Sequence, residues 1–234
     1  MIKIERLPKG YVFTYEDFMD EVNGREAVIK ALNRLAASGR IAKLSKGKFY
    51  KSESTPFGNL EPDRYQVVKD ILEKDGRTAG YLTGLSIYNQ LGLTTQVSNT
   101  IQISKNEVRP KFKRGNYTIV VIRQKNTITK DNIPLLQVLD AIRYIKQIPD
   151  ATVAEAFGRI RSIISDLGSN ERGSMVRLAK KYPPATRALL GAILSNLDDE
   201  ATAKPLMNSL NPITTYTFKG LSEILSEADK WNIV

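Results

Sequence analysis

Residues 25–51 read REAVIKALNRLAASGRIAKLSKGKFYK, and this stretch decides the fold of the N-terminal part of the chain. Its first half carries apolar residues at Val28, Leu32 and Leu35, which is the spacing of one face of a helix. Ile29 joins the same stripe. The first half therefore predicts an amphipathic helix from Arg25 to Ser38.

A hairpin is predicted after this helix. Residues 41–45 alternate between apolar and polar with period two, and residues 48–51 make a second short run of strand type. Lys46 and Gly47 lie between the two runs and provide a turn.

The residues before the helix predict a strand and another helix. Residues 11–13 read as a short strand, and Thr14 with Asp17 three residues later opens a helix through about Val22. Helix, turn, amphipathic helix and hairpin follow one another in the order found in a winged helix-turn-helix, which we expect over residues 1–52.

The charge of this stretch favours double-stranded DNA as a partner. A helix can enter the major groove only if one face packs on its own domain and the other carries donors. With the apolar stripe inward, the outer face presents Lys30, Asn33 and Arg34. Residues 25–51 hold eight Lys or Arg and one acid. The alternative is an ordinary solvated helix face beside a basic hairpin.

The candidate DNA-binding residues are Arg25, Lys30, Asn33, Arg34, Lys43, Lys46, Gly47 and Lys48. Asn33 is suited to adenine, and Arg34 to guanine or phosphate. Lys46 and Lys48 flank Gly47, where a compact turn can approach the DNA backbone or the minor groove.

The predicted fold class is α+β, with a winged helix, a mixed α/β middle domain and a helical C-terminal part. Residues 53–62 have the composition of a linker. The middle domain, residues 63–125, predicts helices at 63–74 and 81–91 and strands at 100–104 and 117–122. The region 126–234 predicts helices at 133–148, 153–167, 174–181, 184–197 and 221–231.

Composition excludes several classes of chemistry. The chain has no Cys and no His, which removes disulfides, thiolate zinc sites, Cys nucleophiles and Ser-His-Asp triads. Carboxylate-based metal chemistry survives this exclusion, but no set of carboxylates is recognisably placed for a metal, so we expect no metal and no cofactor. The net charge of +10 favours polyanionic partners. No apolar run reaches about 18 residues and the start is not a signal peptide, so we expect a cytoplasmic protein without a membrane partner.

The sequence also argues against an enzyme. A nucleotidyltransferase needs a Gly-Ser turn followed by an Asp-x-Asp pair that binds magnesium, and neither Gly168-Ser169 nor Gly173-Ser174 is followed by one. No Gly-rich phosphate-binding loop occurs. The acidic cluster at residues 198–200 is interpreted as a solvated helix end or turn.

Two blocks of sequence resemble AbiEi-type antitoxins. The first block is Leu7-Pro8-Lys9-Gly10-Tyr11-Val12-Phe13, Ala31-Leu32-Asn33-Arg34-Leu35, Gly39-Arg40-Ile41 and Lys46-Gly47-Lys48-Phe49-Tyr50. The second is Gly80-Tyr81-Leu82-Thr83-Gly84-Leu85-Ser86 with Leu91-Gly92-Leu93-Thr94-Thr95-Gln96-Val97. The resemblance ends at about residue 125.

This resemblance implies the antitoxin of a type IV toxin–antitoxin system. Its winged helix would bind repeats in its own promoter and repress the operon, while the rest of the chain counteracts a nucleotidyltransferase toxin. Direct contact with the toxin is not the defining mechanism of that type.

Two other interpretations stay open. One is a stand-alone winged-helix transcription regulator whose C-terminal domain senses a ligand or dimerises. The other is a protein-interaction module whose basic surface serves an acidic partner. The basic stretch from Arg109 to Arg114 either extends the DNA footprint, meets an acidic partner or is a solvated loop.

Overall fold

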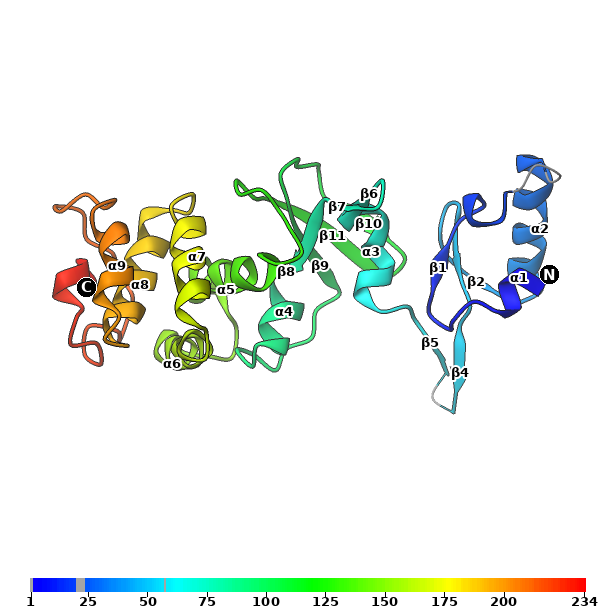
Figure 1. Ribbon diagram of the computed structural model, residues 1–234. Helices are drawn as coiled ribbons and strands as arrows, with labels where there is room; N and C mark the ends of the chain where they lie inside the picture. The colour runs from blue at the N-terminus through cyan, green and yellow to red at the C-terminus, as the bar shows by residue number, and fades with distance from the viewer. Residues whose placement is uncertain (1, 20–23, 57) are drawn as a thin grey trace.

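Helix α2 (Arg25–Ala37) and a three-stranded sheet form the N-terminal end of the molecule. The computed structural model describes residues 2–19, 24–56 and 58–234. Strands β1 (Val12–Phe13), β3 (Lys48–Tyr50) and β2 (Ala42–Ser45) lie in that order, each pair antiparallel. A short helix α1 (Ile2–Glu5) precedes them. Figure 1 shows this part at one end of an elongated molecule, with α2 on the outer side. The predicted helix and hairpin are therefore confirmed.

The helix predicted from Thr14 to about Val22 is wrong in its described part. Only one 3-10 turn forms, η1 (Glu16–Phe18), and Met19 already has extended backbone, while residues 20–22 lie outside the described ranges. The predicted capping contact exists, since the Thr14 amide donates to Asp17 at 2.7 Å. Two aromatic residues three apart, Tyr15 and Phe18, pack into the core, and this spacing matches a 3-10 turn.

The sheet is buried on both faces. Successive strand residues point to opposite sides, so Phe13 and Phe49 face α2, while Val12 and Tyr50 face helix α3 (Arg64–Leu72). Leu44 joins the second face and packs with Val67 and Val68 of α3. Hydrophobic packing therefore continues across residue 52, where the first domain was predicted to end.

Residues 53–62, predicted to be a linker, mostly form a hairpin. Strand β4 (Glu53–Thr55) pairs antiparallel with β5 (Gly58–Leu60). Asp63 then caps α3, because its side chain accepts a hydrogen bond from the Gln66 amide at 3.0 Å.

The middle of the molecule is a four-stranded sheet of order β10-β11-β9-β8. Its strands are β10 (Phe112–Arg114), β11 (Tyr117–Arg123), β9 (Thr100–Lys105) and β8 (Gly80–Thr83), and only β9 and β11 run parallel. Helix α3 covers one face, while α4 (Leu85–Gln90) and α5 (Ile133–Arg143) contact the other side around β8 and β9. A small hairpin of β6 (Glu73–Lys74) and β7 (Arg77–Thr78) follows α3.

The helix predicted at residues 81–91 is wrong in its first part. Tyr81 and Thr83 are strand-favouring residues, and they pair with β9 as part of β8. Gly84 then takes a φ of +73°, a conformation that costs glycine little, and α4 begins after it. The strands predicted at 100–104 and 117–122 are confirmed.

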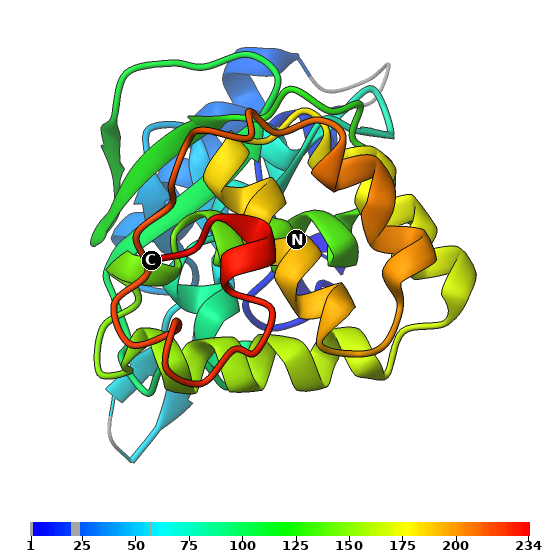
Figure 2. The same cartoon turned by 90° about the vertical axis from the view of Figure 1, so that its left-hand side faces the viewer.

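The C-terminal part is helical, as predicted. It comprises α5, η2 (Ile145–Gln147), α6 (Val153–Ser165), α7 (Ser169–Ala179), α8 (Pro184–Ser195), α9 (Glu200–Met207) and η3 (Asp229–Trp231). Figure 2 shows the last segment of the chain lying across these helices. Within the described ranges, no helix is both long and apolar enough to cross a membrane.

Two C-terminal predictions need correction. The helix predicted at 221–231 is instead a series of turns that ends in η3, and α9 was not predicted. Trp231 explains the turns, because its ring packs against Gly191 of α8 and its Nε1 donates to Ser195 at 3.0 Å. The acidic cluster at 198–200 lies at the start of α9, which confirms a helix end.

A buried carboxylate joins the middle sheet to the C-terminal helices. Asp140 of α5 is 2% exposed and accepts hydrogen bonds from the hydroxyls of Tyr81, Thr83, Ser104 and Tyr182 at 2.8–3.0 Å. These donors come from β8, β9 and the turn before α8. Burial raises the pKa of Asp140 in spite of the four hydroxyl donors.

We expect the stability of the protein to depend on the ionisation of Asp140. The unfolded carboxyl ionises near pH 4, whereas the folded one holds its proton to higher pH. Stability contributed by this group is therefore present at low pH and is lost as the pH rises through the raised pKa. Tyr81, Tyr88 and Tyr182 face Asp140 and stay protonated, because burial raises the pKa of each.

The measurement is urea unfolding of the wild type and Asp140→Asn between pH 4 and pH 9. The wild type should lose unfolding free energy relative to the variant as the pH rises. A difference that is flat, or that grows in favour of the wild type, would show that the folded protein prefers the ionised carboxylate.

Candidate nucleic-acid interface

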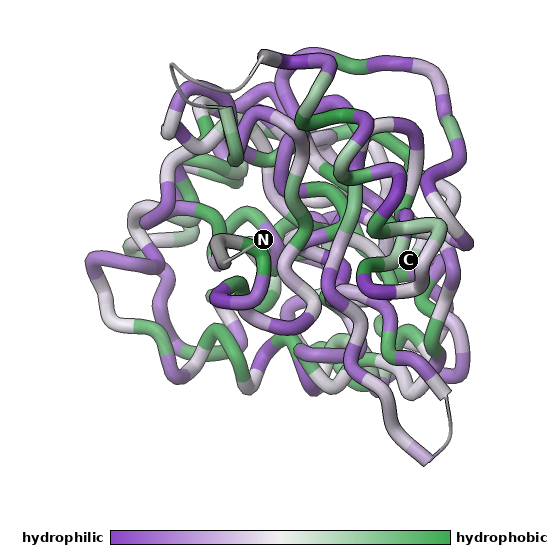
Figure 3. The backbone as a smooth tube through the Cα atoms, turned by 90° about the vertical axis from the view of Figure 1, so that its right-hand side faces the viewer, coloured by the Kyte–Doolittle hydropathy of each residue, from purple (hydrophilic) through white to green (hydrophobic). Residues whose placement is uncertain are grey.

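The outer face of α2 carries polar donors that are exposed to solvent. Lys30, Asn33 and Arg34 are exposed, whereas Leu32 on the inner face is 2% exposed. Residues three and four apart share one face of a helix, so the three donors lie side by side. Figure 3 looks onto this end of the molecule, where hydrophilic and hydrophobic positions alternate along the chain. The structure therefore places Lys30, Asn33 and Arg34 together on one face of α2, as predicted.

Arg25 lies at the first residue of the same helix. It is exposed, and its guanidinium carbon stands 4.8 Å from the centroid of the Tyr15 ring. A cation–π contact of this kind orients the side chain without neutralising its charge. Arg25 therefore adds positive charge at the N-terminal end of α2.

The hairpin residues divide between the two sides of the sheet. Lys43 pairs across the strands with Phe49, so it lies on the face that packs against α2, and it is exposed. Lys46 is exposed beside Gly47, which has a φ of +75° and makes the turn possible. Lys43 therefore lies on the α2 side of the sheet, and Lys46 and Gly47 form the exposed turn of the hairpin.

Lys48 has a different position from the one expected. Its Nζ lies 3.1 Å from Asp70 of α3, and its side chain is 19% exposed. Arg114 donates to the same carboxylate, with Nη2 and Oδ2 3.1 Å apart. Although burial raises the pKa of Asp70, the hydrogen bond and charge of Arg114, together with Lys48, hold it below its ordinary value. Lys48 therefore joins the N-terminal part to α3.

The basic stretch from Arg109 to Arg114 is also divided. Arg114 is 8% exposed and donates to the Val67 carbonyl at 2.7 Å. The Arg109 guanidinium carbon stands 3.8 Å from the centroid of the Phe112 ring. Lys111 and Lys113 are exposed. Arg114 therefore takes part in packing, whereas Lys111 and Lys113 belong to the basic surface.

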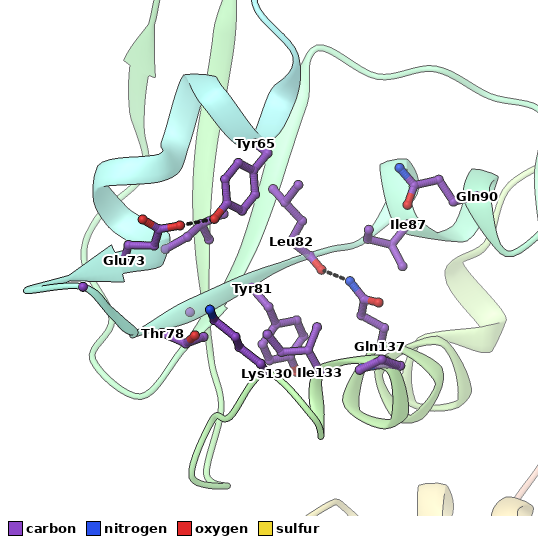
Figure 4. A pocket seen from close by; sticks show the side chains of 14 residues that line it. Tyr65, Glu73, Thr78, Tyr81, Leu82, Ile87, Gln90, Lys130, Ile133 and Gln137 are labelled. Atoms are coloured by element: carbon purple, nitrogen blue, oxygen red, sulfur yellow. Dashed lines mark hydrogen bonds between the residues drawn. The ribbon is translucent and has the colours of Figure 1, made fainter. Parts of the chain in front are cut away.

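A separate cleft of about 550 Å³ lies between α3, β8 and α5 (Figure 4). On the α3 wall Tyr65 donates to Glu73, which raises the pKa of Tyr65 to about 12, and Gln137 donates to the Leu82 carbonyl at 2.9 Å. None of the predicted DNA-binding residues lines this cleft. The cleft and the outer face of α2 are distinct features.

Comparisons with known proteins give a family and a fold. The crystal structure of the RV2827C protein from Mycobacterium tuberculosis is similar, with a TM-score of 0.56 and 14% sequence identity over 89% of this chain and 80% of that one. At this identity the likeness concerns the fold. The comparison with curated proteins found no match. The family model described as a family of unknown function, DUF6088, matches residues 1–171. The chain therefore belongs to the DUF6088 family.

Proposed function

We propose that the protein is a transcriptional repressor that binds duplex DNA through a winged helix-turn-helix formed by residues 1–52. The observation that carries this proposal is the outer face of α2, where Lys30, Asn33 and Arg34 are exposed at the end of the molecule. Arginine and asparagine side chains on such a face can reach base edges, and lysine can reach phosphates. The protein acts as a binder of DNA rather than as an enzyme.

The arrangement of the N-terminal elements supports this proposal. The hairpin of β2 and β3 follows α2 directly in the chain, and β1 completes the sheet as its third strand. Helix and hairpin are therefore fixed on one small sheet. Lys43 and Lys46 are placed on the exposed part of that hairpin. With α2 in the major groove, these lysines provide sequence-independent phosphate contacts.

We also propose an antitoxin role, on the basis of the resemblance to AbiEi-type antitoxins. In this role the repressor controls its own operon, and the remainder of the chain counteracts a nucleotidyltransferase toxin in the cytoplasm. The N-terminal part would then repress the operon, and the residues beyond the hairpins would counteract the toxin.

The variant Lys30→Ala/Arg34→Ala should weaken binding to a duplex from the region upstream of its own gene by tenfold or more. Each charge-assisted hydrogen bond contributes roughly 1.5–3 kcal/mol to binding. Each lost phosphate contact makes the slope of log K against log salt concentration less steep by about 0.9. Fluorescence anisotropy at several salt concentrations measures both quantities. The matched control is Lys74→Ala/Arg77→Ala, which removes two exposed cations from the β6–β7 hairpin. Equal affinity in both variants would rule out α2 as the DNA-binding helix.

Lys48→Met should behave differently. It removes the ammonium that pairs with Asp70 but keeps most of the apolar stem, so the unfolding free energy should fall by about 1 kcal/mol. DNA affinity, measured by the same anisotropy titration, should stay within about twofold of wild type, a difference smaller than one hydrogen bond. A loss as large as that of Lys30→Ala/Arg34→Ala would place Lys48 on the DNA.

Co-expression with an adjacent nucleotidyltransferase gene tests the antitoxin role. We expect the wild type to restore growth, and Lys30→Ala/Arg34→Ala to restore growth while losing repression of a promoter reporter. Failure of the wild type to restore growth would refute the antitoxin role and leave the repressor role standing.

A further inference from the structure

A cationic pocket lies far from α2, where the middle sheet meets the C-terminal helices. It has a volume of about 340 Å³ and lies next to the C-terminal end of β11, the end of α5 and the start of α8. Its lining residues are Arg123, Gln124, Lys125, Arg143, Lys181, Tyr182, Pro183 and Pro184. Four of these residues are cations.

The four cations are not neutralised by the protein. Across the described ranges, no acidic side chain lies within ion-pairing distance of Arg123, Lys125, Arg143 or Lys181, and none lines the pocket. All four side chains are exposed, so water screens their mutual repulsion, while their combined positive charge attracts an anion. The arrangement is therefore that of a site prepared for an anion.

The walls of the pocket are held in place by hydrogen bonds. Gln124 donates to the hydroxyls of Tyr81 and Tyr182 at 2.8 and 2.9 Å. Asn106 donates to the carbonyls of Gln124 and Asn126 at 2.8 and 2.7 Å. The backbone that carries Arg123 and Lys125 is thus held by β8, the loop after β9 and the turn before α8, so it needs little reorganisation when a ligand binds.

Contacts also connect this segment to the end of α7 and to the turn before α8. Asn126 donates to the Leu178 carbonyl at 3.1 Å, and Lys181 donates to the Lys125 carbonyl at 3.4 Å. The guanidinium carbon of Arg143 stands 5.0 Å from the centroid of the Tyr144 ring. Cations from three separate segments are therefore held around one cavity.

We propose that this pocket binds a phosphoryl group. Two arginines offer planar forks that match phosphate oxygens, and two lysines add point charges. The pocket lies at the lower end of the volume range of small-molecule sites, which suits a phosphoryl group with a small attached group. The ligand is a phosphate-bearing small molecule or a phosphate of a nucleic-acid backbone. The inference is independent of the DNA-binding proposal, because none of its residues belongs to the N-terminal part.

The test is isothermal titration calorimetry of the full chain with inorganic phosphate, pyrophosphate, AMP and a single-stranded dodecamer, each at constant ionic strength. We expect saturable binding of at least one probe, weakened about tenfold or more in Arg123→Ala/Arg143→Ala, since each fork loses a charge-assisted hydrogen bond. The matched control, Lys74→Ala/Arg77→Ala, and the α2 variant Lys30→Ala/Arg34→Ala should bind the small probes like wild type.

A second variant and the dodecamer complete the test. Lys125→Ala removes one exposed cation and replaces the double variant if that variant does not fold. The dodecamer shows where the bound phosphate comes from. If the pocket variants weaken binding of the dodecamer and none of the small probes binds, the ligand is a phosphate of a nucleic-acid backbone. Absence of saturable binding by all four probes, or binding that the pocket variants do not weaken, would overturn the proposal.

Discussion

The two-sided burial of the small N-terminal sheet determines what the rest of that part can do. Because strand residues alternate, Phe13 and Phe49 must pack on α2 while Val12 and Tyr50 pack on α3. One side of α2 is used by this packing, and its other side is left with polar residues facing solvent. The same alternation places Lys43 on the α2 side.

The ion pairs around Asp70 follow from the second face of the sheet. Lys48 and Arg114 approach the same carboxylate from two different sheets, so the N-terminal part and the middle sheet are connected by charge as well as by apolar contact. The surface proposed to bind DNA is in this way attached to a structure that keeps α2 outermost. A basic residue in a sequence pattern can thus serve packing as readily as recognition.

Asp140 has a comparable role at the other end of the middle sheet. Its four hydroxyl donors come from the sheet and from the turn before α8, and one hydrophobic core extends from Tyr81 and Tyr88 through the C-terminal helices. Gln124 and Tyr182 belong both to this network and to the wall of the cationic pocket. A ligand in that pocket would therefore contact the structure that joins the two parts.

Elements governed by local pattern could be predicted from the sequence. The apolar spacing of α2, the alternation of the hairpin and the strand character of residues 100–104 and 117–122 all led to correct elements. Elements decided by distant contacts could not. Residues 81–83 have apolar spacing that fits a helix, but pairing with β9 makes them a strand, and Trp231 fills a space at Gly191 that no local pattern reveals.

The candidate site shows the same limit. Exposure of Lys30, Asn33 and Arg34 follows from helical periodicity, so it was predictable. The pairing of Lys48 with Asp70 depends on the position of α3, and the cationic pocket joins residues from β11, α5 and the turn before α8. A single sequence holds no signal for either arrangement, because each joins segments that are far apart in the chain.

The central claim, that α2 lies against DNA, is tested most directly by site-specific photo-crosslinking. A photoreactive side chain in place of Asn33 should crosslink to a duplex from the upstream region of the gene. The same side chain in place of Tyr65, which is 41% exposed on α3, should not crosslink. Crosslinking at position 65 with none at position 33 would contradict the account.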